Sequence, residues 1–323
     1  MRAIIPVAGI GKRLRPHTYT LPKVLLNVGG KPIIGHIFDK IIADGFTEAT
    51  LVVGHLGDMI RDYINTNYKI RVDFVHQAEQ RGLAHAVHIA QDTCKSGPVL
   101  IILGDTIFDV DLKPVIRGGF SSLGVKSVDD PRRFGVVETQ NGFVTSLIEK
   151  PEKPQSNLAI VGLYWIENPS LLFECITELI QMDRKTKGEY QLTDALQLMV
   201  KHGEKIKTFP VEGWYDCGKP ETVLATNRHL LGQKSHYREQ KGVSIQSPVF
   251  IADNATVTNS IIGPYTTIAD GAKIHDSIIR NSIVGEGAVV ENIVLEDSLI
   301  GNRAVIRGSA KKINIGDSSE YQS

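Results

Sequence analysis

The sequence lacks paired cysteines, an excess of either charge and any long apolar run. Three cysteines, at positions 94, 175 and 217, stand far apart without a CxxC pair, so neither a disulfide framework nor a zinc site is predicted and a reducing compartment is expected. The 36 basic and 36 acidic residues cancel, which disfavours nucleic-acid and membrane partners. The start of the chain predicts neither a signal peptide nor a membrane span. We therefore expect a cytoplasmic protein.

Patterns typical of two common kinds of catalytic site are also missing. The ten histidines show no metal-ligand spacing, and His85 and His88, three apart on an expected helix, have no obvious third ligand. No Ser-His-Asp or Cys-His order stands out. The chemistry has to come from other residue types.

A glycine pair followed by cations ends the first apolar run, residues 3–7. Glycines let backbone N–H groups turn inward around an anion, and nearby cations add charge. Four cations near one strand end of a neutral protein favour a phosphate site over a solvated basic turn. The loop and its cations comprise Gly9, Gly11, Lys12, Arg13, Arg15 and Lys23.

This loop departs from the two commonest nucleotide-binding patterns. Leu14 occupies the place of the third glycine in a dinucleotide fingerprint, and no acidic residue ends the second expected strand, 50–53. The pattern GxxxxGK[ST] is absent as well. The loop therefore predicts an anion cradle of another type.

Apolar runs alternate with helical patterns up to about residue 115, which predicts an α/β domain with a mainly parallel sheet. Ligands bind at the carboxyl ends of such strands, where the glycine loop and Asp105 both stand. By position alone, Asp105 fits a turn or N-cap role equally well. Together with Asp216, it provides the carboxylates that Mg²⁺ takes beside phosphate oxygens.

Aliphatic residues recur every five or six positions from Ile251 to Ile306, often followed by a small residue. Hexapeptide periodicity is typical of a β-helix and is favoured here over ordinary antiparallel strands. We predict a catalytic domain at 1–232, a linker at 233–242, a β-helix at 243–315 and a polar tail at 316–323.

Taken together, the motifs resemble those of the sugar-1-phosphate nucleotidylyltransferases, also called nucleotide-sugar pyrophosphorylases, whose long members end in a left-handed β-helix. Seven motifs match in order and cover the whole chain; taken singly, several read as plain loops. Lys12 departs from the family, which usually has Ser or Thr there. The matching segments are Gly9–Thr18 with Pro22-Lys23, Gln77 with Gly82-Leu83-Ala84, Leu103-Gly104-Asp105, Glu149-Lys150-Pro151, Val161–Tyr164, Gly188–Asp194 and Trp214-Tyr215-Asp216.

The resemblance implies Mg²⁺-assisted transfer of a nucleotidyl group from an NTP to a sugar 1-phosphate, with release of pyrophosphate. It makes Arg13 and Lys23 the catalytic pair and Asp105 and Asp216 the metal ligands. It assigns nucleotide binding to Ala8, Gly9, Gly11, Lys12, Gln77, Gly82 and Asp105, and sugar-phosphate binding to Gly135, Glu149, Lys150, Gly162 and Lys187.

The resemblance favours UTP or dTTP with glucose 1-phosphate, because Gln77 and Gly82 resemble the uracil and thymine readers. Mannose-1-phosphate guanylyltransferase and N-acetylglucosamine-1-phosphate uridylyltransferase remain alternatives. A hexapeptide acyltransferase and a non-catalytic regulatory subunit are rival classes, although the catalytic cations and carboxylates are all present. A homo-oligomer, assembled through the β-helix, is also expected.

Overall fold

The computed structural model describes residues 1–94 and 97–308, and contacts divide the chain into two compact units. The first unit, called the catalytic unit after the domain predicted there, comprises Met1–Leu26 and Lys31–Thr222. The second unit comprises Asn27–Gly30 with the chain from Val223 onward. The predicted tail, 316–323, and the last residues of the predicted β-helix, 309–315, lie outside the described residues.

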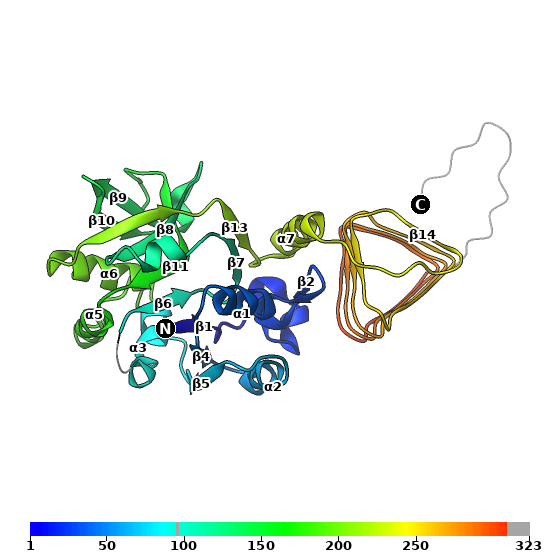
Figure 1. The fold of residues 1–323 in the computed structure, drawn as a ribbon, viewed down its shortest axis with the longest axis horizontal. Helices are drawn as coiled ribbons and strands as arrows, with labels where there is room; N and C mark the ends of the chain where they lie inside the picture. The colour runs from blue at the N-terminus through cyan, green and yellow to red at the C-terminus, as the bar shows by residue number, and fades with distance from the viewer. Residues whose placement is uncertain (95–96, 309–323) are drawn as a thin grey trace. The chain divides into compact units, whose positions relative to one another are not determined.

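A mixed sheet of nine strands forms the centre of the catalytic unit (Figure 1). Its parallel half is built from apolar runs, and the middle strand is buried on both faces, with Ala3, Ile4 and Ile5 fully covered. That half comprises β1 (Arg2–Pro6), β4 (Glu48–Val53), β5 (Arg71–His76) and β6 (Val99–Ile102), and β1 lies between β4 and β6.

The other half of the sheet begins with β11 (Leu158–Ile166), which pairs antiparallel with β6. A separate two-stranded sheet joins β7 (Thr106–Asp109) to β13 (Gly213–Asp216). This antiparallel pair brings the end of β13 beside Asp105, whose carbonyl accepts from the N–H of Cys217 at 2.9 Å. The remaining strands are β8 (Ser121–Ser127), β9 (Gly135–Gln140), β10 (Phe143–Glu149) and β12 (Ile206–Pro210).

Helices cover both faces of this sheet, with α1 and α2 on one side and α3, α5 and α6 on the other (Figure 1). The apolar periodicity of α1 is typical: its buried positions include Ile33, Ile34, Ile37, Phe38 and Ile41. The helices are α1 (Ile33–Ala43), α2 (Gly57–Asn67), α3 (Leu83–His88), α4 (Lys113–Ile116), α5 (Pro169–Gln181), α6 (Leu192–Lys201) and α7 (Pro220–Gln233). Short 3₁₀ turns span Lys12–Leu14, His17–Tyr19, Lys23–Leu25, Gln91–Thr93 and Pro131–Arg133.

Short parallel strands stack into three sheets in the second unit and give it the triangular section seen in Figure 1. Val243 pairs with Ser260 and Ile278 with Val294, so one coil takes 17 or 16 residues. The strands are β14 (Val243–Ile245), β15 (Val249–Ile251), β16 (Thr256–Thr258), β17 (Ser260–Ile262), β18 (Thr266–Ile268), β19 (Lys273–His275), β20 (Ile278–Arg280), β21 (Ile283–Val284), β22 (Val289–Glu291), β23 (Val294–Glu296), β24 (Leu299–Ile300) and β25 (Val305–Arg307). The predicted fold, an α/β sheet domain followed by a β-helix of the left-handed type, is confirmed.

The periodic aliphatic residues point into the β-helix: Ile262, Ile268, Ile274 and Ile279 are fully buried. Within the segment predicted as a linker, the N–H of His236 donates to Val249 O at 2.8 Å. The two short strands at the start of the chain are β2 (Asn27–Val28) and β3 (Lys31–Pro32).

Asn227 of α7 ties the second unit together. Its side-chain oxygen accepts from the N–H of Gly29 at 2.8 Å and from the hydroxyl of Thr267 at 2.6 Å, and its amide donates to Tyr265 O at 3.1 Å. The side chain is fully buried, so all three bonds replace water.

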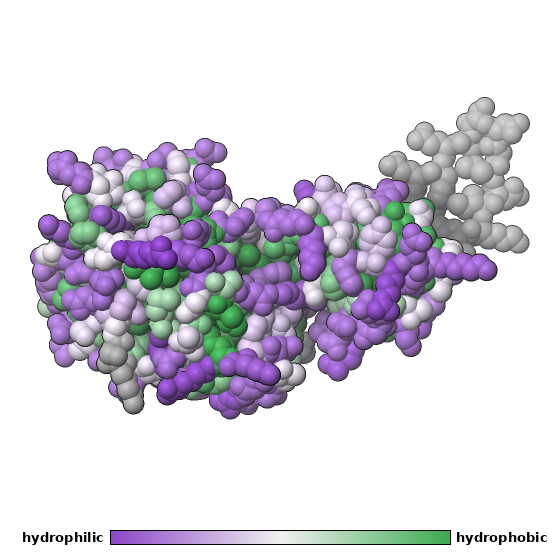
Figure 2. All heavy atoms as spheres, in the orientation of Figure 1, coloured by the Kyte–Doolittle hydropathy of each residue, from purple (hydrophilic) through white to green (hydrophobic). Residues whose placement is uncertain are grey.

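Among the described residues, no helix is long and apolar enough to cross a membrane. Hydrophilic residues cover most of the face of each unit that Figure 2 shows.

Candidate active site

The glycine loop follows β1 and is held by short-range contacts. Gly11 has φ +68, and a Cβ there would lie 3.0 Å from Thr18 Cγ2 and 3.2 Å from Lys23 Cβ. The hydroxyl of Thr18 donates to Gly11 O at 2.9 Å. Gly11 is therefore a glycine because the loop passes tightly against the segment that carries Lys23.

The predicted catalytic and metal residues meet at the carboxyl ends of the strands. Lys23 is nearly buried, and its Nζ lies 2.6 Å from Asp105 Oδ2. A Cβ on Gly218 would lie 2.8 Å from both Arg13 Nη2 and Asp216 Oδ1, so these two side chains flank one glycine. Residues from four separate segments thus form one cluster of two cations and two carboxylates.

The charge of Asp105 disfavours the ionised form of Asp216. Burial raises the pKa of Asp216, and the nearby charge of Asp105 raises it further, against the opposing effects of Lys23 and Arg13. Two carboxylates brought together in this way supply hard oxygen donors for a divalent cation that takes its other ligands from phosphates. Asp105 and Asp216 therefore fit the predicted Mg²⁺ ligands chemically, while three-residue clusters of His, Cys, Asp or Glu suited to a metal are absent from the described residues.

The predicted base-reading segment runs from the end of β5 to α3. The N–H of Gln77 donates to Val53 O at 2.8 Å, and its side-chain amide nitrogen lies 3.1 Å from Nδ1 of His85. Gln80, which sequence reasoning did not single out, donates from Nε2 to Ala8 O at 2.7 Å. This bond ties the base-reading segment to the glycine loop.

Two other predicted sugar-phosphate residues, Gly135 and Lys150, lie around Glu149. Its Oε1 is 3.1 Å from Lys150 Nζ, and its Oε2 accepts from the hydroxyl of Thr193 at 2.7 Å. Gly135 faces the same group, since a Cβ there would lie 2.8 Å from Thr193 Oγ1 and 3.1 Å from Glu149 Oε2. Thr193 therefore belongs to this group. The only signal for it in the sequence was its place in the motif Gly188–Asp194.

The other two predicted sugar-phosphate residues, Gly162 and Lys187, make different contacts. Gly162 has φ +85 and packs against Leu103, whose Cδ1 would be 2.5 Å from an added Cβ. Lys187, with φ +54, lies at an exposed turn that is closed by reciprocal backbone bonds between Thr186 and Glu189.

One cavity of about 530 Å³ gathers most of the predicted site. Among the predicted residues, Gly135, Glu149, Gly162, Lys187 and Asp216 are outside its lining, whereas Glu189 and Gln80 belong to it without having been predicted. The predicted residues that line it are Ala8, Gly9, Gly11, Lys12, Arg13, Lys23, Gln77, Gly82, Asp105 and Lys150.

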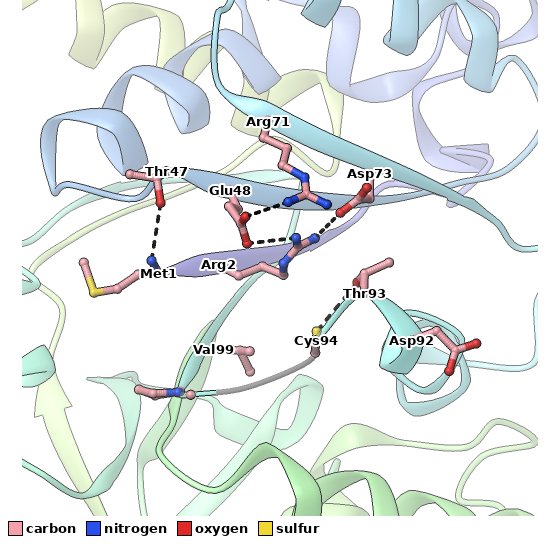
Figure 3. Close-up of a pocket in the computed structure, with 12 residues that line it drawn as sticks. Met1, Arg2, Thr47, Glu48, Arg71, Asp73, Asp92, Thr93, Cys94 and Val99 are labelled. Atoms are coloured by element: carbon pink, nitrogen blue, oxygen red, sulfur yellow. Dashed lines mark hydrogen bonds and ion pairs between the residues drawn. The ribbon is translucent and has the colours of Figure 1, made fainter.

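A second cavity, of about 700 Å³, opens at the amino ends of the parallel strands (Figure 3). The guanidinium of Arg2 there donates to Glu48 at 2.9 Å, to Asp73 at 2.5 Å and to the hydroxyl of Thr50 at 2.8 Å. Arg71 adds a further contact to Glu48 at 3.2 Å. Because its cations are already paired, this cavity suits a polyphosphate less than the strand-end cavity does.

Trp214 is a further residue that sequence reasoning used only as part of a motif. Its ring packs edge-on against Phe134, with centroids 5.2 Å apart. Its indole N–H is buried and finds no acceptor among the described residues. A buried donor of this kind is costly unless a ligand satisfies it.

A model of the nucleotidyl transferase family matches residues 2–233, and the chain belongs to that family. The predicted enzyme class is thereby confirmed: the protein is a nucleotidyltransferase. The family match ends within α7 and covers the whole of the strand-end cavity.

Named relatives extend the comparison. The low-salt glycan biosynthesis nucleotidyltransferase Agl11 of Haloferax volcanii is 31% identical over 316 residues, which cover 88% of this chain and 87% of the relative. The UTP–glucose-1-phosphate uridylyltransferase AglF of the same organism is 35% identical over 231 residues, 68% of this chain and 93% of AglF. The bifunctional protein GlmU of Methanococcus maripaludis is 35% identical over 264 residues; they cover 80% of this chain but only 62% of GlmU.

A solved structure shares the fold of the catalytic unit. UDP-glucose pyrophosphorylase complexed with UDP-glucose superposes with a TM-score of 0.65 at 25% sequence identity, covering 72% of this chain and 99% of that one.

Proposed function

We propose that this protein transfers a nucleotidyl group from UTP or dTTP to glucose 1-phosphate and releases pyrophosphate. The observation that carries the proposal is that Arg13, Lys23 and Asp105 line the same cavity as Gln77 and Gly82. Such a cavity offers charged groups to phosphates and amide and backbone groups to a base. The activities for which AglF and UDP-glucose pyrophosphorylase are named support the choice of substrates.

The reaction needs charge neutralisation rather than a general base. The phosphate of a sugar 1-phosphate has a second pKa of about 6, so its oxygen is already a nucleophile at neutral pH. That oxygen attacks the α-phosphorus in line, the bond to the β-phosphate oxygen breaks, and pyrophosphate leaves with the electron pair. Arg13 and Lys12 hold the departing pyrophosphate, and Lys23 neutralises the reacting α-phosphate.

Asp105 and Asp216 are the residues that would hold Mg²⁺. The cation would screen the negative charge of the two phosphate substrates when bound. Without it, the chain itself restrains Asp105 through Lys23, whose ammonium lies 2.6 Å from Oδ2. Lys23 is thus prepared to pass from a carboxylate to a phosphate when substrate enters.

The sugar side of the site supports a hydroxyl-rich acceptor. The bonded pair Glu149–Thr193 offers oxygen atoms to which sugar hydroxyls can bind. N-acetylglucosamine 1-phosphate is the second candidate acceptor, because of the similarity to GlmU over the catalytic unit. Gln80 does not distinguish the two acceptors, because its side chain bonds to the glycine loop at Ala8 O.

Pyrophosphate release by the purified protein with Mg²⁺ tests the proposal. Five nucleotides are paired with glucose, N-acetylglucosamine and mannose 1-phosphates, and UTP or dTTP with glucose 1-phosphate is expected to give the highest kcat/KM. Lys23→Ala should lower kcat by about 10²-fold or more, because an electrostatic contact to the reacting phosphate is lost. Lys113→Ala, on α4 outside the cavity, is the control. Release that does not need a sugar phosphate, or no release from any pair, would contradict the proposal.

Assembly and location also remain proposals. Stacked coils leave an end that needs cover, which supports a homo-oligomer formed through the β-helix. A monomeric mass by light scattering would count against it. The cytoplasm, where nucleoside triphosphates are available, is the location that the proposed substrates require.

A further inference from the structure

The base-reading segment is hydrogen-bonded to a second segment, residues 183–193, through Tyr190. The N–H of Tyr190 donates to Arg81 O at 2.9 Å, and its carbonyl accepts from the N–H of Ala84 at 3.0 Å. Tyr190 is 1% exposed, so both bonds are shielded from water. The two backbone bonds lie on either side of Gly82 and join the segments as a short ladder.

The close approach explains why residue 82 is a glycine. Gly82 has φ +112, and a Cβ there would lie 2.5 Å from Tyr190 O and 2.7 Å from Tyr190 N. These atoms belong to backbone and cannot move aside as the end of a side chain can. Contact with the neighbouring segment therefore requires a glycine at position 82, independently of any contact between Gly82 and the nucleotide base.

Side chains reinforce the same contact. The guanidinium carbon of Arg81 lies 5.1 Å from the centroid of the Tyr190 ring, and its Nη2 donates to the phenol oxygen at 3.2 Å. The phenol in turn donates to a carboxylate oxygen of Asp183. A cation held over a buried ring is a stronger contact than one over an exposed ring. Arg81 thus fixes Tyr190 from the side of the base-reading segment.

Tyr190 anchors the segment that carries the proposed sugar-phosphate contacts. Lys187 lies at the turn closed by Thr186 and Glu189, and Gln191 donates from Nε2 to Thr186 O at 3.2 Å. Beyond the anchor, Thr193 donates to Glu149 at 2.7 Å. A shift of Tyr190 would move the turn on one side and Thr193 on the other.

We infer that Arg81 is a positioning residue for the sugar-phosphate side of the reaction, although it belongs to the base-reading segment. It holds Tyr190, and through Tyr190 it sets where Lys187 and Thr193 meet the acceptor. The inference rests on the proposed function, because it takes Lys187 and Glu149 as acceptor contacts. Arg81 therefore lies in the segment that contacts the nucleotide base, but its effect is expected on the binding of the sugar 1-phosphate.

The test measures the KM for the nucleotide and the KM for the sugar 1-phosphate in Arg81→Ala and in the wild type, with the substrates that the wild type uses. The KM for the sugar 1-phosphate is expected to rise about tenfold, because a displaced binding group loses its alignment. The KM for the nucleotide should change by less than about twofold. Arg81→Lys should be intermediate, since an ammonium keeps a cation over the ring but loses the guanidinium bond to the phenol. Arg71→Ala is the matched control, because Arg71 lies at the start of β5, away from the base-reading segment that follows the strand.

Hydrogen exchange gives a readout that does not depend on activity. Peptides covering 183–191 should exchange faster in Arg81→Ala than in the wild type, while β1 and β6 keep their protection. A larger rise in the nucleotide KM, unchanged KM values, or unchanged exchange at 183–191 would overturn the inference. If the wild type turns over no pair, the proposed function fails, and the exchange experiment still decides whether Arg81 anchors the segment.

Discussion

Asp216 is a carboxylate whose ionised form the fold makes costly. Burial is the first cause of its raised pKa, and the charge of Asp105 is the second. A carboxyl group with a raised pKa in the folded state destabilises that state at higher pH. The penalty disappears as the pH falls below the unfolded value, about 3.9. The proposed function uses this charge, and the folded state is less stable for keeping it.

The substitution Asp216→Asn is expected to raise the melting temperature at neutral pH and to abolish turnover. Each kcal/mol regained should add about 2–4 °C to the melting temperature of a unit the size of the catalytic unit. The gain should shrink as the pH is lowered toward 4, because the wild-type carboxyl then protonates. Thermal unfolding at several pH values measures this, with Asp109→Asn, an exposed carboxylate on β7, as the control. An equal gain at every pH would show that charge is not the cause.

The sequence predicted most of the residues that converge on the cavity but not their contacts. Gly11 and Asp105 follow strand ends, and strand ends of a parallel sheet share one edge. The contact between Arg81 and Tyr190 joins positions 109 apart in the sequence, and only the folded chain reveals it. No pattern of spacing encodes a pairing between two irregular segments.

At the scale of elements, Gly162 is an irregular point in β11. The pairing of β11 with β8 shifts register between Ile160 and Tyr164, and Gly162 adopts φ +85 within that interval. The carbonyl of Gly162 accepts from the N–H of Leu103 at 3.0 Å. The irregular part of β11 is therefore hydrogen-bonded to the residue that precedes Gly104-Asp105. The glycine thereby supports the strand end that carries Asp105.

Two alanine variants can separate strain from steric clash at this position. Gly162→Ala combines a positive φ with a Cβ 2.5 Å from Leu103, whereas Gly119→Ala has φ +64 and no atom within 4 Å. Gly119→Ala should cost about 1 kcal/mol from the backbone alone, and Gly162→Ala about 1–3 kcal/mol more. Urea unfolding measures both values. Equal losses would mean that Leu103 moves aside without cost.

Elements with a strong period were the ones that the sequence could predict. The five- to six-residue spacing in the β-helix places Ile268 and Ile274 inside, where both are fully buried. The strands β2, β3 and β7 were missed, because segments of two to four residues are too short to show a period. Their pairing depends on contacts with distant parts of the chain.

At the scale of the whole molecule, the chain contains separate hydrophobic cores. One cluster in the catalytic unit includes Ile4, Leu172 and Tyr164, and another lies inside the β-helix and includes Ile268 and Ile279. Stability in stacked coils comes largely from neighbouring coils, and that in the sheet domain from its own layers. Two such units need not unfold at the same denaturant concentration.

We predict two unfolding transitions, which tryptophan fluorescence and circular dichroism can separate. Both tryptophans of the chain, Trp165 and Trp214, lie in the catalytic unit, so fluorescence reports that unit alone, whereas circular dichroism reports both. Ile279→Ala empties an inward position and should cost about 2–5 kcal/mol in the transition that fluorescence does not see. Leu172→Ala should move the fluorescence transition instead.

The outward neighbour provides the control for this experiment. Ile278 lies beside Ile279 on β20 but is only partly buried, so Ile278→Ala should cost less than Ile279→Ala in the same transition. If Ile279→Ala shifts the fluorescence midpoint as far as the circular dichroism midpoint, the two cores unfold as one. In that case the β-helix would stabilise the catalytic unit directly, and turnover at elevated temperature should fall in parallel with the loss of the β-helix core.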